Sequence, residues 1–206
     1  MPHEWYPHAR KMKRKIIYHH GPTNAGKTFS ALEDLEKSNK GIYCAPLRLL
    51  AWEIHERLEA KNVLCDLITG QEKILRENSD HVSCTIETSN LGDVYDVAVI
   101  DEIQMIGNEE RGAAWTNSLL GLQASTIHLC GEGRALSLVS KLCETTGDYL
   151  EERKYERYSR VFIEDEPFKL QDLQEGDCII TFSTRNVHKM KNVLAKICFF
   201  SLTFKF

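Results

Sequence analysis

The sequence lacks the features that mark membrane-spanning, secreted and zinc-binding proteins. No run approaches the roughly 20 apolar residues of a transmembrane helix, and the first residues lack the apolar stretch of a secretory signal. The seven cysteines are odd in number and form no C-x-x-C pair, which argues against a disulfide framework and a zinc site. We expect Cys44, Cys84, Cys130 and Cys178, which lie in apolar runs, to be buried, reduced thiols of an intracellular protein.

The chain also lacks a strong charge of either sign. Its net charge is −4 over 206 residues, so the whole molecule has no strong electrostatic attraction to nucleic acid. Basic residues cluster only near the start, which leaves open a local basic groove or a solvated basic tail. The cluster consists of Arg10, Lys11, Lys13, Arg14 and Lys15. With 42% hydrophobic residues, the composition is typical of a globular protein of one domain, or one and a fraction.

Residues 21–28 read Gly-Pro-Thr-Asn-Ala-Gly-Lys-Thr and fit G-x-x-x-x-G-K-[ST], a loop that holds nucleotide phosphates. A β-prone run at 15–20 precedes the loop, and helical spacing of apolar residues follows it, as this motif requires. Glycines at both ends allow the backbone N–H groups to approach phosphate oxygens. We therefore expect ATP to be bound by Gly21, Pro22, Thr23, Asn24, Ala25, Gly26, Lys27 and Thr28. Lys27 would reach the β- and γ-phosphates, and the Thr28 hydroxyl would ligate Mg²⁺.

Strand and helix patterns alternate along the chain. Strands are predicted at residues 15–20, 41–45, 63–69, 82–86, 94–100 and 126–130. Helices are predicted after the phosphate loop and at 47–58, 113–122 and 134–145, with a polar surface stretch at 71–81. This alternation predicts an α/β fold with a parallel sheet flanked by helices, which binds ligands at the carboxyl ends of its strands.

Two adjacent carboxylates, Asp101 and Glu102, follow the apolar run at 94–100. In a parallel sheet they would lie at the same edge as the phosphate loop. Asp101 is expected to hold Mg²⁺, and Glu102 to orient or deprotonate the water that attacks the γ-phosphate. The pair alone is a weak signal, since acids often follow a strand, but the upstream loop gives it a catalytic meaning.

The character of the sequence changes near residue 147. Beyond it lies a charged stretch at 151–160, and then a predicted strand at 178–182 and a helix at 186–196. We therefore expect a first domain at 1–146 and the incomplete start of a second domain at 147–206.

From about Trp5 to about Leu194 the chain resembles the DExH/D-type RNA helicases of the mitochondrial RNA degradosome, which belong to helicase superfamily 2. Clear matches read Ala-Pro-Leu-Arg-Leu-Leu-Ala at 45–51, Asp-Glu-Ile-Gln-Met-Ile at 101–106 and His-Leu-Cys-Gly-Glu at 128–132. Further matches lie at 5–7, 14–17, 21–28, 65–70, 83–87 and 176–178. The resemblance implies two RecA-like domains, ATP hydrolysis, 3′-to-5′ unwinding of RNA and also of DNA, and a mitochondrial exoribonuclease partner.

The resemblance also assigns residues. Lys27, Asp101 and Glu102 match the family's ATP and magnesium site, and Gln104 stands where related helicases have His and would sense the state of the phosphate loop. Contacts to the nucleic-acid backbone are implied for Pro46, Arg48, Thr69, Gly70, Thr85 and Glu87. Turn chemistry is an alternative reading of Pro46 and Gly70, and a solvated helix face of Arg48.

The chain departs from the family in three places. Gly133 and Arg134 replace the usual Pro and small residues, no Q-x-x-G-R-x-G-R motif occurs, and residues 199–206 do not resemble the family. Because that motif supplies the arginine finger of the second domain, we expect a truncated helicase that binds ATP and unwinds duplexes weakly or undetectably.

Two other functions stay open from the sequence. A thymidine-kinase-type enzyme also joins a phosphate loop to Asp-Glu-x-Gln, although its cysteine pairs and substrate lasso have no counterpart here. The other is a non-catalytic fragment that binds nucleotide, RNA or a partner.

Overall fold

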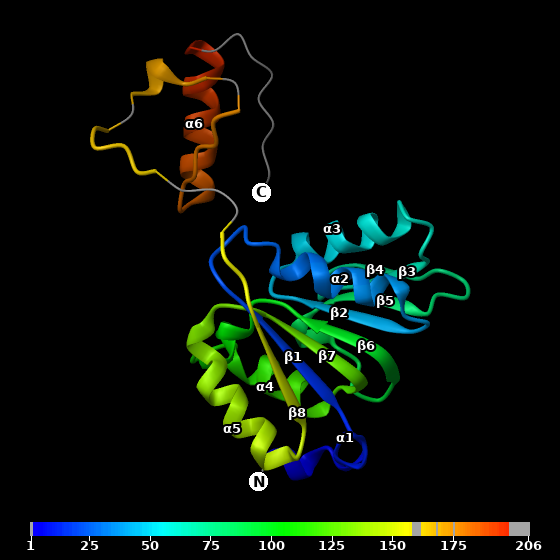
Figure 1. Cartoon of the computed structure of the whole chain (residues 1–206). Coiled ribbons are helices and arrows are strands. Elements are labelled where there is room, and N and C mark those ends of the chain that lie inside the picture. Colours follow the sequence, from blue (N-terminus) through cyan, green and yellow to red (C-terminus); the bar gives the residue numbers. More distant parts are fainter. Residues whose placement is uncertain (1, 158–161, 168, 175, 198–206) are drawn as a thin grey trace. The chain divides into compact units, whose positions relative to one another are not determined.

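Figure 1 shows the computed structural model, which describes residues 2–157, 162–167, 169–174 and 176–197. The chain divides into two compact units, Met1–Arg160 and Val161–Phe206, which are described separately.

Unit 1 is built on one eight-stranded sheet. Its strands are β1 (Lys15–His20), β2 (Gly41–Ala45), β3 (Cys65–Ile68), β4 (Lys73–Ile74), β5 (His81–Thr85), β6 (Val94–Ile100), β7 (Gln123–Gly131) and β8 (Tyr149–Lys154). They lie in the order β4-β3-β5-β2-β6-β7-β1-β8, and every neighbouring pair is parallel except β3 with β4. The predicted α/β fold is confirmed, with one antiparallel strand added in the stretch predicted as a surface loop.

Helices cover both faces of the sheet (Figure 1). The α-helices of this unit are α1 (Pro7–Lys11), α2 (Lys27–Lys37), α3 (Arg48–Glu59), α4 (Gly112–Gly121) and α5 (Leu136–Thr146). Short 3₁₀ helices are η1 (Pro2–Trp5), η2 (Ile86–Thr88), η3 (Ile103–Gly107) and η4 (Gly133–Ala135). No described helix is long and apolar enough to cross a membrane.

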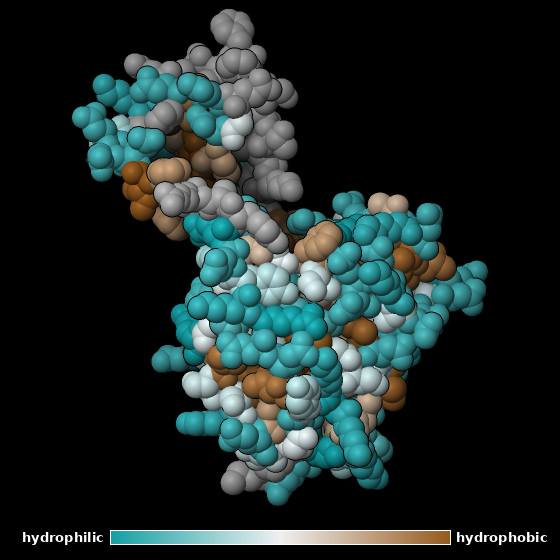
Figure 2. Space-filling model, viewed as in Figure 1, coloured by the Kyte–Doolittle hydropathy of each residue, from teal (hydrophilic) through white to brown (hydrophobic). Residues whose placement is uncertain are grey.

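Alternation along the strands divides the core into two clusters. On β2, Ile42 and Cys44 pack with α4 and α5, whereas Tyr43 and Ala45 pack with α2 and α3. Burial of both faces explains why the central strands are nearly continuous apolar runs. The visible outer surface of the unit is largely hydrophilic (Figure 2).

Strand β8 extends the sheet past the domain boundary expected at residue 146. It pairs in parallel with β1 from Lys15 opposite Tyr149 to His20 opposite Lys154. The turn before it is tied to the unit by Asp148, whose Oδ1 accepts a 2.9 Å hydrogen bond from Nε of the buried Arg14. The last four residues of β8 are charged, Glu-Glu-Arg-Lys at 151–154. An edge strand tolerates such charges because one of its sides is open, so its sequence resembles that of a solvated linker.

The basic cluster near the start is only partly a surface feature. Arg14 is buried and donates from Nη1 to the carbonyl oxygens of Leu119 (2.9 Å) and Leu122 (3.0 Å). Arg10 donates from Nη2 to Leu120 O at 2.7 Å. These two arginines attach the C-terminal end of α4 to the segment that leads into β1. The cluster therefore forms neither a continuous basic groove nor a solvated tail.

Unit 2 contains η5 (Leu170–Asp172) and α6 (Thr184–Ile197), which confirms the helix predicted at 186–196. The strand predicted at 178–182 is wrong: these residues form no ladder, and Ile180 and Phe182 are exposed. Among the described residues of this unit there is no other strand to pair with this segment. For the same reason Cys178 is exposed, contrary to expectation, whereas Cys44, Cys84 and Cys130 are buried thiols as predicted. The predicted tail at 199–206 lies outside the described residues.

Two buried histidines face one another across β1 and β7. His19 Nε2 and His128 Nδ1 are hydrogen-bonded at 2.8 Å, and both side chains are fully buried. Burial, aided by the nearby positive charge of Arg153, lowers the pKa of each histidine to about 4. Both are therefore neutral in the folded protein near neutral pH.

This pair predicts a loss of stability in mild acid. In the unfolded chain the histidines bind protons near pH 6.5, but in the folded chain they do so only near pH 4. The free energy of unfolding should therefore fall as the pH drops from about 6.5 to about 4, by up to ~1.4 kcal/mol per pH unit for each proton. Urea unfolding followed by circular dichroism at several pH values measures this slope. The variant His128→Asn should show a shallower slope, and an unchanged slope would contradict the interpretation.

Candidate functional site

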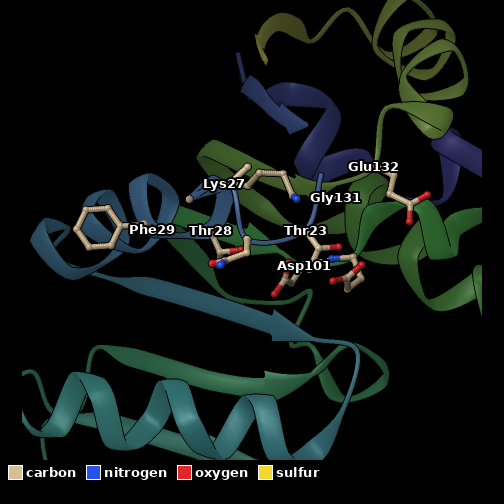
Figure 3. Close-up of a pocket in the computed structure, with 11 residues that line it drawn as sticks. Thr23, Lys27, Thr28, Phe29, Asp101, Gly131 and Glu132 are labelled. Carbon is tan, nitrogen blue, oxygen red and sulfur yellow. Dashed lines mark hydrogen bonds between the residues drawn. The ribbon is translucent and has the colours of Figure 1, made fainter. Parts of the chain in front are cut away.

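The carboxyl ends of β6, β7 and β1 lie together at one edge of the sheet. Residues 21–28 follow β1, Asp101 follows β6, and Gly131 ends β7. A pocket of about 300 Å³ opens there, lined by residues 23–29 and by Asp101, Glu102, Gly131 and Glu132 (Figure 3). The parallel order thus brings the predicted phosphate loop and the predicted carboxylates into one cavity.

The loop has the backbone shape that its glycines allow. Gly26 caps the start of α2 in the left-handed conformation, with φ 78°. Asn24 is also left-handed, with φ 60°, a conformation that asparagine tolerates. Gly21 has no room for a side chain, because an added Cβ would lie 2.4 Å from the carbonyl oxygen of Tyr155. The N-terminus of the 11-residue helix α2 therefore points its free N–H groups into the pocket.

Lys27 lies at the start of α2 and folds back over the loop. Its Nζ donates hydrogen bonds to Gly21 O (2.9 Å) and Pro22 O (2.6 Å). An ammonium has three donors, so the same group can bind phosphate oxygens at the loop. Figure 3 shows Thr28 and Asp101 on the same side of the loop, with the Phe29 ring directed away.

Asp101 is the buried acid of the site. Its Oδ2 accepts a 2.7 Å hydrogen bond from the Tyr43 hydroxyl, and its Oδ1 accepts one of 2.9 Å from the backbone N–H of Glu102. Burial raises the pKa of Asp101, while these two bonds oppose the shift. A carboxylate and the Thr28 hydroxyl are oxygen ligands of the kind that Mg²⁺ prefers, so this donor set fits the ion.

Glu102 and Gln104 connect the ends of β6 and β7. Glu102 has the left-handed backbone that is uncommon for a side-chain-bearing residue, with φ 50°. Gln104 donates from Nε2 to the Glu102 carboxylate, and its Oε1 accepts a 3.0 Å hydrogen bond from the N–H of Glu132. Gln104 therefore joins the Glu102 carboxylate, after β6, to the backbone of Glu132, directly after β7.

Sequence reasoning left several residues out of the site. Trp115 is fully buried and donates from Nε1 to Asp101 O at 2.9 Å, and the Tyr18 hydroxyl donates to Glu132 O at 2.6 Å. With Tyr43, they fix the backbone and side chains around the pocket from three elements. Only an apolar or aromatic pattern marks them in the sequence, and core residues show the same pattern.

The residues expected to touch nucleic acid lie at the neighbouring strand ends. They follow β2, β3 and β5, which are adjacent in the sheet and run parallel. Pro46 and Arg48 follow β2, Thr69 and Gly70 follow β3, Thr85 ends β5, and Glu87 lies in η2. The structure thus places all six along one edge, beside the pocket that the phosphate loop lines.

Several of these residues already have partners within the chain. The Thr69 hydroxyl accepts a 3.0 Å hydrogen bond from the N–H of Glu72 in the β3–β4 turn, and Arg48 donates to the Gln71 side chain. Glu87 pairs with Arg111 at 2.8 Å. Gly70 is exposed, and no atom lies within 4 Å of a Cβ added to it.

Arg111 is a further residue of this edge that the sequence did not single out. Its Nη2 also donates to Pro46 O at 2.7 Å, so it joins the segment after β2 to η2. Its place just before the helix predicted at 113–122 is the only sequence signal for this role.

Replacement of Gly131 tests how tightly the strand ends are packed. An added Cβ would lie 3.0 Å from the Ile103 backbone nitrogen and 2.2 Å from Gln104 Oε1. The Gln104 side chain would have to move and give up its hydrogen bond with the N–H of Glu132, so Gly131→Ala should destabilise the fold by about 1–3 kcal/mol. Gly107→Ala in η3 is the matched control, because nothing lies within 4 Å of its added Cβ. Urea unfolding measures both variants.

The double variant Gly131→Ala/Gln104→Ala removes one of the clashing groups and should recover part of the lost stability. Equal unfolding midpoints for Gly131→Ala and Gly107→Ala would contradict the close packing of Gly131.

Comparisons with known proteins show the family to which the chain belongs. Residues 2–155 match the family model described as the DEXQ-box helicase domain of Suv3. The chain is 49% identical over 196 residues to the mitochondrial DExH-box ATP-dependent RNA helicase DExH16 of Arabidopsis thaliana, covering 95% of this chain and 34% of that protein. It is 47% identical over 195 residues to the human mitochondrial ATP-dependent RNA helicase SUPV3L1, covering 92% of this chain and 25% of that protein.

A solved structure supports the fold. A DEAD box protein from Methanococcus jannaschii aligns with a TM-score of 0.52 at 20% identity, over 71% of this chain and 46% of that one. The chain spans 34% and 25% of the two relatives above. Its Asp-Glu-Ile-Gln at 101–104 is the sequence form of a DEXQ box. The chain therefore belongs to the Suv3 family of DEXQ-box helicases.

Proposed function

We propose that the chain is the ATP-binding motor domain of a mitochondrial ATP-dependent RNA helicase. The observation that carries this proposal is the single pocket that unites the phosphate loop with Asp101 and Glu102. Names of the relatives support RNA as the substrate and mitochondria as the compartment.

ATP would be held by its phosphates. Loop N–H groups and Lys27 would bind the phosphate oxygens, with the positive end of α2 favouring their negative charge. Mg²⁺ would be held by Thr28 and Asp101 and would neutralise charge that develops on the phosphates. Glu102 would orient the attacking water, and Gln104, hydrogen-bonded to Glu102, would position that carboxylate.

RNA would lie along the ends of β3, β5 and β2. Arg48, Gly70 and Thr85 would offer donors and open backbone to phosphate and sugar without reading bases. Strand β2 lies between β5 and β6, so it is shared by the RNA edge and the nucleotide pocket. Tyr43 of β2 is hydrogen-bonded to Asp101, which gives the two halves a direct physical connection.

Finer assignments rest on the family resemblance. They are 3′-to-5′ polarity, action on DNA as well as RNA, and partnership with an exoribonuclease in mitochondrial RNA decay. These 206 residues contain no Q-x-x-G-R-x-G-R motif, so on their own they would bind ATP and unwind duplexes poorly. Family membership favours this function over a thymidine-kinase-type enzyme. RNA-stimulated ATP hydrolysis would separate it from a fragment that only binds nucleotide.

Loss of the loop lysine tests the proposal. Lys27→Ala should weaken ATP binding by about tenfold or more, because charged hydrogen bonds to the phosphates are lost. Equilibrium titration with a fluorescent ATP analogue measures the affinity. Lys61→Ala is the control, because Lys61 is exposed and pairs with Glu36 away from the pocket. If ATP binds equally well to the folded Lys27→Ala variant, the assignment fails.

A further inference from the structure

Tyr155 contacts the entrance of the phosphate loop from a distant part of the sequence. It directly follows β8, the edge strand beside β1. Its backbone N–H donates a 2.8 Å hydrogen bond to the carbonyl oxygen of His20, the last residue of β1. The ladder between these strands therefore continues one step beyond β8, at the last residue before the phosphate loop.

The same residue packs against Gly21. A Cβ built on Gly21 would lie 2.4 Å from the Tyr155 carbonyl oxygen and 3.2 Å from the Tyr155 Cβ. Real Cβ atoms do not approach backbone oxygens this closely, so only glycine fits here. Gly21 thus serves a purpose besides approach to phosphate: it admits the backbone of Tyr155.

The Tyr155 side chain makes a third attachment. Its hydroxyl and His19 Nδ1 are hydrogen-bonded at 2.8 Å, and the two rings lie 5.6 Å apart. His19 in turn is hydrogen-bonded to the buried His128 of β7. Tyr155 therefore holds three consecutive residues, His19, His20 and Gly21, against a rigid and buried part of the sheet.

These contacts reach the phosphate-binding groups in one further step. Gly21 O accepts a hydrogen bond from Lys27 Nζ at 2.9 Å, so the backbone that Tyr155 holds also receives the loop lysine. A shift of that carbonyl would move the acceptor that orients the lysine. Small displacements of binding groups have large effects where several donors converge on one ligand.

We propose that Tyr155 is a positioning residue for the nucleotide site, which fixes the entrance of the phosphate loop through its contacts with residues 19–21. This inference rests on the proposed function, because it takes the loop to be the phosphate site of ATP. Unit 1 ends at Arg160, so Tyr155 lies close in sequence to the segment that joins the two units. The phosphate loop is thus attached to the strand that leads out of the motor domain.

The test removes one hydroxyl in the full 206-residue chain. Tyr155→Phe keeps the ring and the backbone contacts but loses the hydrogen bond to His19. Affinities for MgATP and for magnesium tripolyphosphate, which carries only the phosphate part of the ligand, are measured by competition with a fluorescent nucleotide. We expect both to weaken by roughly three- to tenfold, the range that one net hydrogen bond corresponds to. Urea unfolding is measured in parallel at the same temperature.

Tyr149→Phe is the matched control. Tyr149 begins β8, the edge strand that Tyr155 follows. It is 65% exposed, and its hydroxyl has no hydrogen-bond partner within the described part of the chain. Its substitution should leave both affinities unchanged. The inference is overturned if folded Tyr155→Phe binds MgATP and tripolyphosphate as the unsubstituted chain does, whether or not its stability falls. If the unsubstituted chain itself binds neither ligand, the proposed function fails and the inference fails with it.

Discussion

The parallel pairing of β6, β7 and β1 is the constraint on which the site depends. Its register places Ile100 opposite Leu129 and His20 opposite Gly131, so the residues that follow these strands emerge at one level of the sheet. The phosphate loop, the buried Asp101 and Gly131 at the end of β7 then line one pocket. Burial of both sheet faces under helices makes this arrangement rigid.

The residues of the site are held in place by hydrogen bonds from neighbouring side chains and backbone groups. Tyr43 and the N–H of Glu102 orient the two oxygens of Asp101, and the Trp115 indole holds its carbonyl. Gln104 joins Glu102 to Glu132, and Tyr155 joins β8 to the loop entrance. These contacts attach the ends of β2 and β6, of β6 and β7, and of β8 and β1 to each other. Such hydrogen bonds keep the residues that would contact a ligand in place.

Local patterns predicted the parts of the molecule that local sequence determines. The phosphate loop, the Asp101–Glu102 pair and most helices follow from residue spacing, and the structure places them where the spacing indicates. Tyr43 and Tyr155 could not be predicted as site residues, because their roles arise from contacts between segments far apart in sequence. Gly131 lies in a stretch that matches the family, but its close packing against Gln104 could not be predicted from that match. Strand β8 resembles a linker because an edge strand with one open side can carry charges. The segment at 178–182 has strand-like residues but no strand to pair with among the described residues of its unit.

The edge predicted to contact nucleic acid shows the same division. Its six predicted residues follow adjacent strands, yet Glu87 is paired with Arg111 and the Thr69 hydroxyl serves the β3–β4 turn. Sequence motifs predicted the positions of these six residues, but they did not predict the side chains and backbone groups with which the residues pair. Arg111 donates to the Pro46 carbonyl oxygen, and its Cζ lies 5.2 Å from the centroid of the Trp115 ring. Because Trp115 is hydrogen-bonded to the Asp101 carbonyl oxygen, this edge is in contact with a residue that holds Asp101.

The central claim is that Asp101 and the phosphate loop form one magnesium-dependent nucleotide site. It is tested most directly by measuring the affinity of the chain for ADP with and without Mg²⁺, in the unsubstituted protein and in Asp101→Asn. Asparagine keeps an oxygen acceptor for Tyr43 but lacks the charge that binds the cation. The account predicts that Mg²⁺ strengthens nucleotide binding in the unsubstituted chain and has little effect in the variant. Equal strengthening by Mg²⁺ in both proteins would contradict it.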